Sequence, residues 1–274
     1  MDVTEVLHLL ALGLYAVCAA LLGVSLARSA RRLPAAATAC LAVAVAAHAA
    51  ALWAFAARHG ELPLVGLGPS LSVLALLVAI GSLLLATLGR TGPLGLVLVP
   101  VAAVLAAVAE VAGMRPDSQE LAFRGPWFVL HVVLAMAGYA GLTVAFAAGL
   151  MYLLQFRQLK GKRFGAVFRF FPPLETLDRI GRRALMLGLP VLALALLLGW
   201  AWSERFGPPM RPGNPKVVLG VLTLAVFGAA LAARGGEGSA RARRGALASV
   251  VGFALVVAAY VLLRATESSG AGFL

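Results

Sequence analysis

Long apolar runs separated by short polar segments dominate the pattern of this chain. A helix needs about 20 apolar residues to cross the hydrocarbon core of a bilayer. Eight runs are close to that length or longer, at about 4–27, 35–57, 70–89, 93–113, 126–156, 184–202, 215–233 and 246–264. The pattern predicts an all-α polytopic integral membrane bundle of eight transmembrane helices, forming a single membrane domain over residues 1–274.

The fifth run is the longest, and the rest of the chain is organised around it. A row of small residues recurs along it at four-residue spacing: Ala137, Gly141, Ala145 and Gly149. In lipid, small residues on one helical face let a neighbouring helix approach closely. We predict a long central helix that packs through this face and is anchored by the basic residues at its end.

Lysine and arginine are distributed unevenly between the loops. With loops assigned alternately to the two sides of the membrane, sixteen of the 23 basic residues fall on one side. These are Arg28, Arg31, Arg32, Arg90, Arg157, Lys160, Lys162, Arg163, Arg169, Arg179, Arg182, Arg183, Arg234, Arg241, Arg243 and Arg244. Because the richer side faces the cytoplasm, both termini are expected outside. The net charge of +12 is thus a topology signal, and without interleaved aromatic residues it does not indicate nucleic-acid binding.

Two segments beside the spans have predicted structures of their own. In the longest loop, 157–183, Pro172-Pro173 precede LETLDRIGRRAL, which reads as a short helix. This loop is either an interfacial segment attracted to anionic lipid or a docking site for a cytoplasmic partner. Ser70 and Ser72, just after Pro69, are expected to cap the third helix.

Ionisable side chains within the spans are the first candidates for a functional site, because they are costly in a membrane. His48 lies near the middle of the second run. His131 lies in the outer part of the fifth, with Trp127 four residues earlier on the same helical face. In a compact bundle His8 and Glu110 share the depth of His131, and His48 lies deeper. A neutral imidazole at such a depth can bind haem iron; the alternative is a hydrogen bond to the backbone of a neighbouring helix.

Motifs of the common enzyme classes are missing from the sequence. It has no zinc-ligand spacing, no H-E-x-x-H pair, no Walker loop and no serine nucleophile elbow. We therefore expect a protein that is not an enzyme.

The stretch WFVLHVVLAMAGYAGLTVAFAAGLMYLLQFRQLKGKR resembles the cytochrome c assembly family, membrane haem-handling proteins of the CcsA and HemX type. The family's histidine, Gly-Tyr pair, Tyr-Leu pair and basic end are matched by His131, Gly138-Tyr139, Tyr152-Leu153 and Lys160 to Arg163. The similarity continues through PPLETLDRIGRRALMLGLPVLALALLLGWAW. It also reaches back to AHAAALWAFAARHGELPLVGLGPSLS, which places His48 on a histidine of the family's early helix. The resemblance implies a family-like core at about 126–264, preceded by a four-helix part at 1–113.

The sequence departs from the family pattern in its outer loop and in its histidines. The family's tryptophan-rich loop ending in Trp-Asp-Pro-Lys is RFGPPMRPGNPK here, with Asn214 in place of the aspartate. Two further family histidines are absent around Arg234 and Arg264. The resemblance implies two haem sites with two histidines each, of which this chain keeps His48 for the membrane site and His131 for the outer one. Each would then act with an open or substituted second axial position.

Three functional hypotheses follow. In the first, the protein serves cytochrome c biogenesis by handling or presenting haem, with His131 and His48 as iron ligands, Trp127 beside them and another assembly subunit as partner. In the second, it is a HemX-like non-catalytic scaffold that regulates a haem-biosynthesis enzyme through loop 157–183. A small-solute transporter is the least supported, because no internal repeat is present. The expected location is the bacterial cytoplasmic (inner) membrane, in contact with lipid.

Overall fold

The computed structural model describes residues 2–28, 33–89, 91–115, 125–162, 165–206, 214–235 and 239–268. All regular secondary structure within these residues is helical, which confirms the all-α class. The helices are α1 (Val3–Arg28), α2 (Leu33–His59), α3 (Leu67–Thr87), the short 3₁₀ turn η1 (Gly92–Leu94), α4 (Gly95–Ala112), α5 (Pro126–Lys160), α6 (Ala166–Phe170), α7 (Leu174–Phe206), α8 (Pro215–Ala232) and α9 (Ser239–Ser268).

Seven helices among the described residues are long and apolar enough to cross a membrane. The apolar part of α8, Val217–Ala232, is shorter than these seven. The chain is therefore a multi-pass membrane protein. An eighth span and the outward orientation of both termini stay predictions.

The predicted loop 157–183 is largely helical, which corrects the sequence-based boundaries. Helix α5 continues to Lys160, and α7 begins at Leu174 directly after the two prolines and runs to Phe206. The predicted short helix is therefore the first part of α7. The prediction ended the span at the basic residues because charge does not belong in hydrocarbon, but a helix can continue beyond the membrane. Pro190 removes one backbone donor within α7 without ending it.

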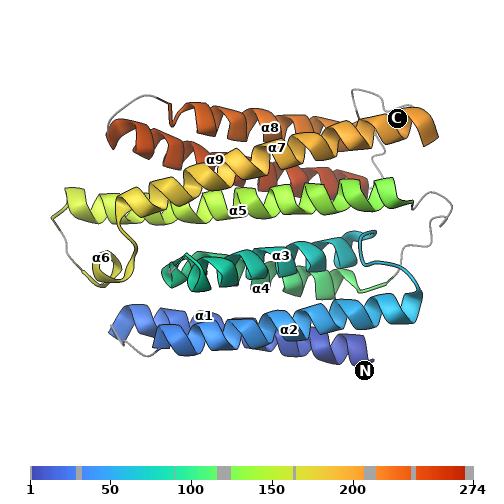
Figure 1. Ribbon diagram of the computed structural model, residues 1–274, viewed down its shortest axis with the longest axis horizontal. Coiled ribbons are helices and arrows are strands. Elements are labelled where there is room, and N and C mark those ends of the chain that lie inside the picture. The colour runs from blue at the N-terminus through green and yellow to red at the C-terminus, as the bar shows by residue number, and fades with distance from the viewer. Residues whose placement is uncertain are drawn as a thin grey trace.

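Helix α5 lies between two groups of helices (Figure 1). Helices α1 to α4 lie on one side of it and α7 to α9 on the other. One buried apolar cluster joins α1 to α4 with α5, and a second joins α5 with α7, α8 and α9. The first residues of α5 lie at the same end of the bundle as the N-terminus (Figure 1). We call this the N-terminal end, and the opposite end, where α5 finishes and α7 starts, the basic end.

Small residues let α5 and α7 approach closely, as the sequence predicts. A Cβ atom built on Gly141 would lie 3.3 Å from the Cα of Gly188, and one on Gly138 would lie 2.9 Å from the Cβ of Leu192. Side chains at these positions would push the helices apart. Ala137, which begins the predicted row, is exposed, so the packed face starts one residue later.

Further along α5 the same row of small residues turns toward α9. Ala145 is fully buried, and a Cβ atom on Gly149 would lie 2.9 Å from the carbonyl oxygen of Ala246. The small residues of α5 therefore contact α7 first and α9 further along. These two contacts explain why α5 lies in the centre of the bundle.

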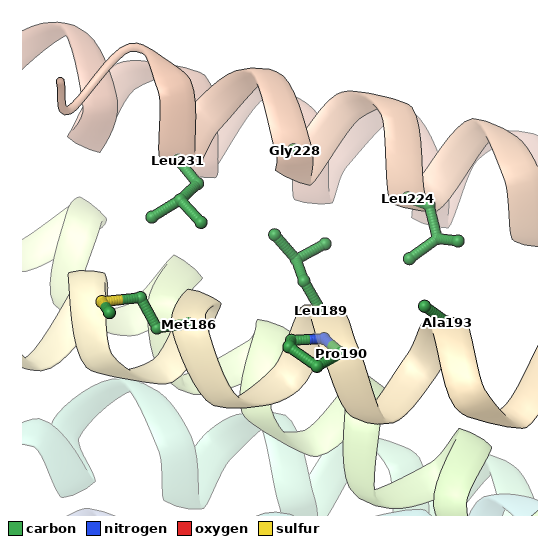
Figure 2. A pocket seen from close by; sticks show the side chains of 7 residues that line it. All are labelled: Met186, Leu189, Pro190, Ala193, Leu224, Gly228 and Leu231. Atoms are coloured by element: carbon green, nitrogen blue, oxygen red, sulfur yellow. The ribbon is translucent and has the colours of Figure 1, made fainter.

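Helices α7 and α8 pack less tightly against each other than α5 and α7 do. They leave an apolar groove of about 500 Å³ between them (Figure 2). The groove is lined by Met186, Leu189, Pro190, Ala193, Leu224, Gly228 and Leu231. Gly228 contributes no side chain, and a Cβ atom built on it would meet nothing within 4 Å. The missing side chain on α8 leaves this space open.

Candidate functional site

A chain of five polar side chains connects four helices near the N-terminal end. Glu110 Oε2 lies 2.7 Å from His8 Nδ1, and His8 Nε2 lies 3.0 Å from Ser72 Oγ. Ser72 Oγ is 2.8 Å from His48 Nε2, and His48 Nδ1 is 3.0 Å from the Tyr15 hydroxyl. All but Glu110 are fully buried, and the Glu110 side chain is 27% exposed. We call this set the polar chain.

One arrangement of protons satisfies every member of the polar chain. An ionised carboxylate only accepts, so Glu110 accepts from His8 Nδ1–H. His8 Nε2 then accepts from the Ser72 hydroxyl, Ser72 accepts from His48 Nε2–H, and His48 Nδ1 accepts from the Tyr15 hydroxyl. Both imidazoles are neutral in this arrangement, and neither keeps an unused ring nitrogen.

Helix geometry brings the polar chain together. His8 and Tyr15 are two turns apart on one face of α1, and the His8 and His48 rings meet edge to face with centroids 5.0 Å apart. The expectation that Ser70 and Ser72 cap α3 is wrong, because α3 begins at Leu67 with Gly66 as its N-cap. The helix can start before Pro69 because proline is tolerated in the first helical turn. Ser72 therefore lies within the helix, where its side chain is buried.

His131 lies apart from the polar chain and bonds to α7. Its Nδ1 is 2.6 Å from the carbonyl oxygen of Ala195. A carbonyl oxygen only accepts, so Nδ1 carries the proton and the neutral ring has its lone pair on Nε2. Within the described residues Nε2 makes no hydrogen bond. Metal-binding histidines use this arrangement, in which the second ring nitrogen donates to a fixed acceptor.

The His131 ring packs against Gly199 of α7. A Cβ atom on Gly199 would lie 2.6 Å from His131 Cε1 and 3.4 Å from Nε2, so only glycine leaves room for the imidazole. The sequence analysis missed Gly199; its one signal is a single glycine late in an apolar run. Aromatic residues lie within about one helical turn of His131 and Gly199 along α5 and α7: Trp127 is 56% exposed, and the rings of Phe128 and Trp202 have centroids 6.3 Å apart.

The two predicted ligands therefore differ in how well they fit haem iron. His131 is half-buried and keeps a lone pair on Nε2, which fits an axial ligand. His48 is fully buried with both ring nitrogens occupied, so it does not fit as it lies. Binding iron would require Tyr15 or Ser72 to move away. Among the described residues, no three His, Cys, Asp or Glu side chains form a group that could hold a metal ion.

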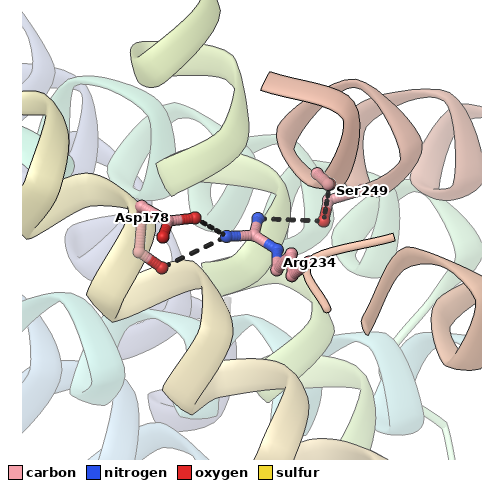
Figure 3. Close-up of polar contacts among 4 residues, drawn as sticks. Asp178, Arg234 and Ser249 are labelled. Carbon is pink, nitrogen blue, oxygen red and sulfur yellow. Dashed lines mark hydrogen bonds and ion pairs between the residues drawn. The ribbon is translucent and has the colours of Figure 1, made fainter. Parts of the chain in front are cut away.

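Arg234, where the family pattern has a histidine, forms a buried ion pair at the basic end (Figure 3). Its Nη1 donates to Asp178 Oδ1 at 2.6 Å and to the Asp178 carbonyl oxygen at 3.1 Å. Its Nη2 donates to Ser249 Oγ at 3.4 Å. Burial lowers the pKa of the guanidinium, and the Asp178 carboxylate opposes that shift. Arg234, two residues beyond the end of α8, is thereby tied to α7 through Asp178 and to α9 through Ser249.

The remaining family features fall largely outside the described residues. Residues 207–213 of the outer loop lie outside them, as does the side chain of Arg264. Asn214 is described and exposed.

Nearly the whole chain is similar to known proteins. A family model for the Cytochrome C assembly protein matches residues 5–269. Protein HemX of Brevibacillus brevis is 36% identical over 97 residues, 35% of this chain and 36% of that protein. Cytochrome c biogenesis protein CcsA of Synechococcus elongatus is 27% identical over 276 residues, 84% of each chain. CcsA of Guillardia theta is 26% identical over 155 residues, 51% of each chain. The chain thus spans between a third and a half of several relatives and most of others.

Proposed function

Because the chain belongs to the cytochrome c assembly protein family, we propose that it serves cytochrome c biogenesis by handling haem at the N-terminal end of the bundle through His131. The observation that carries the proposal is the bond from His131 Nδ1 to the Ala195 carbonyl oxygen, which leaves the lone pair on Nε2. The N-terminal end would face outward in the bacterial cytoplasmic membrane.

Each neighbour of His131 has a defined task in this proposal. The Ala195 carbonyl fixes the tautomer and the ring orientation, and Gly199 gives the ring its space. Trp127, one turn before His131 on α5, offers an exposed apolar surface for a porphyrin edge. When bound, haem supplies a redox-active iron. With His131 as the one protein ligand, haem would be held by a single bond from the chain, which suits a protein that passes haem on.

The role of His48 as the ligand of a separate membrane haem site stays a prediction, and it requires a change in the polar chain. In the proton arrangement above, the lone pair of His48 lies on Nδ1 and is occupied by the Tyr15 hydroxyl. Tyr15 would have to turn away before iron could bind. Nε2–H would then still donate to Ser72, so the rest of the polar chain would orient the ligand.

The proposal is tested by complementation. The gene is deleted from its host, and wild type, His131→Ala or His59→Ala is returned. Covalently bound haem in c-type cytochromes is then measured. His59 is the matched control because its Nδ1 also bonds to a backbone carbonyl oxygen, that of Phe55, at 3.0 Å. We expect His59→Ala to restore cytochrome c and His131→Ala to fail at equal protein levels in the membrane. If His131→Ala restored cytochrome c fully, His131 would not be needed for cytochrome c biogenesis and the proposal would be refuted.

A second candidate function is the scaffold that regulates a haem-biosynthesis enzyme. The similarity to HemX of Brevibacillus brevis supports it, together with the exposed basic residues Arg179, Arg182 and Arg183 at the start of α7. In that case deletion would change haem synthesis, and His131→Ala would complement as well as wild type. Removing the basic residues would abolish complementation.

A further inference from the structure

The groove between α7 and α8 runs toward the basic end, where positive charge lies in line with it. Met186 and Leu231 line its end nearest the start of α7, and Ala193 and Leu224 line the other end (Figure 2). Arg182 and Arg183 precede Met186 by four and three residues, so they share its helical face about 5–6 Å further along α7. Both arginines are exposed.

Within the described ranges, the acidic side chains at this end pair with arginines other than Arg182 and Arg183. Asp178 is engaged by the buried guanidinium of Arg234, and Glu175 pairs with Arg179. Among the described residues neither Arg182 nor Arg183 forms an ion pair with an acidic side chain.

We propose that the groove binds one acyl chain of an anionic phospholipid whose headgroup phosphate lies at Arg182 and Arg183. The lining offers no charged or hydrogen-bonding side chain, so it fits a hydrocarbon chain. Helix α7 is one of the seven helices long and apolar enough to cross a membrane, and the shorter apolar helix Val217–Ala232 of α8 forms the other wall. Its volume of about 500 Å³ is in the usual range of ligand pockets, about 300–1,000 Å³. Guanidinium groups bind phosphate with two parallel hydrogen bonds. The bound lipid would fill the loose contact between α7 and α8.

Two variants, each with a matched control, test separately how the groove and the arginine charge contribute to lipid binding. Gly228→Leu adds a side chain where nothing lies within 4 Å, so it fills the groove. Gly23→Leu is its control, because Gly23 is exposed on α1 and also faces open space. Arg182→Gln with Arg183→Gln removes the charge. Arg157→Gln with Lys160→Gln removes two exposed charges at the same end, on α5.

The test uses the full chain purified in detergent and mixed with equal amounts of phosphatidylglycerol and phosphatidylcholine that carry identical acyl chains. Native mass spectrometry counts the lipids that remain bound. Wild type and both controls should retain phosphatidylglycerol in preference. Gly228→Leu should lose the bound lipid, and the arginine double variant should lose the preference, by about fivefold per arginine.

Three results would overturn the proposal. The first is equal retention of both lipids by the wild type. The second is unchanged retention by Gly228→Leu. The third is a dimer without bound lipid that Gly228→Leu dissociates, since a second copy of the chain would then occupy the groove. If Gly228→Leu does not fold, the arginine double variant decides alone, because its side chains are exposed and an unchanged preference would refute the headgroup site.

Discussion

Replacing Ser72 with alanine tests whether the polar chain is a connected network. Ser72 joins the two buried histidines, accepting from His48 and donating to His8. The substitution removes one oxygen atom and leaves the Nε2 atoms of both histidines without this partner. Ser82 supplies the matched control, because it lies on the same helix and is 2% exposed, and within the described residues its Oγ has no hydrogen-bond partner.

The magnitude follows from the two hydrogen bonds that are lost. Side-chain hydrogen bonds within membrane proteins contribute about 0.6 kcal/mol on average and up to about 1.7 kcal/mol. Ser72→Ala should therefore lower the free energy of unfolding by about 1–3 kcal/mol. Ser82→Ala should leave the free energy of unfolding unchanged or raise it slightly, because it removes a buried hydroxyl that has no partner.

The assay is reversible unfolding in mixed micelles by titration with SDS, followed by helical circular dichroism. Equal effects of the two alanine substitutions would refute the network, because they would show that Ser72 contributes no more than a serine without a hydrogen bond.

Three further substitutions test the site and the helix contacts. Gly199→Ala places a methyl group 2.6 Å from the His131 ring; overpacking of about 1–3 kcal/mol should weaken haemin binding roughly five- to 150-fold in an absorption titration. Gly138→Leu inserts a side chain into the contact between α5 and α7 and should lower the free energy of unfolding by about 1–3 kcal/mol or more in the SDS titration. Asp178→Ala leaves the guanidinium of Arg234 buried without its carboxylate and should lower the same free energy by about 3–5 kcal/mol.

Each of these substitutions has its own control. Gly228→Ala should leave haemin binding unchanged, because a methyl group there meets open space, and equal weakening would contradict the role of Gly199. Gly23→Leu is the control for Gly138→Leu, because the added leucine at position 23 meets open space and should leave the free energy of unfolding unchanged. Arg234→Met combined with Asp178→Ala should recover most of the lost stability, since no buried charge then remains unpaired. A strictly additive double variant would contradict the ion pair.

The sequence predicted the helices well because their signal is local. Long apolar runs predicted the bundle, and the small residues of α5 predicted close contact with a neighbouring helix, which the structure shows to be α7 and then α9. The helix predicted after Pro172-Pro173 and the span predicted at 184–202 are one continuous helix, α7, because charge limits a membrane span but does not end a helix. The short apolar part of α8 leaves the predicted count of eight spans open.

The candidate site was predicted only residue by residue. His8, His48, His131 and Glu110 stood out as ionisable groups in apolar runs, but their pairing depends on how four helices face one another. Sequence reasoning therefore could not show that His8, His48 and Glu110 share the polar chain and that His131 does not. Ser72 resembled a helix cap in the sequence. Nothing in the sequence around Gly199 indicated that the His131 ring packs against it.

The most direct test of the central claim is the absorption spectrum of the detergent-purified protein during titration with haemin, before and after reduction. We predict a saturable Soret band for wild type and for His59→Ala, and its loss in His131→Ala. An unchanged Soret band in His131→Ala would contradict ligation by His131 and direct attention to His48. No band in the wild type at any haemin concentration would contradict haem handling by this chain.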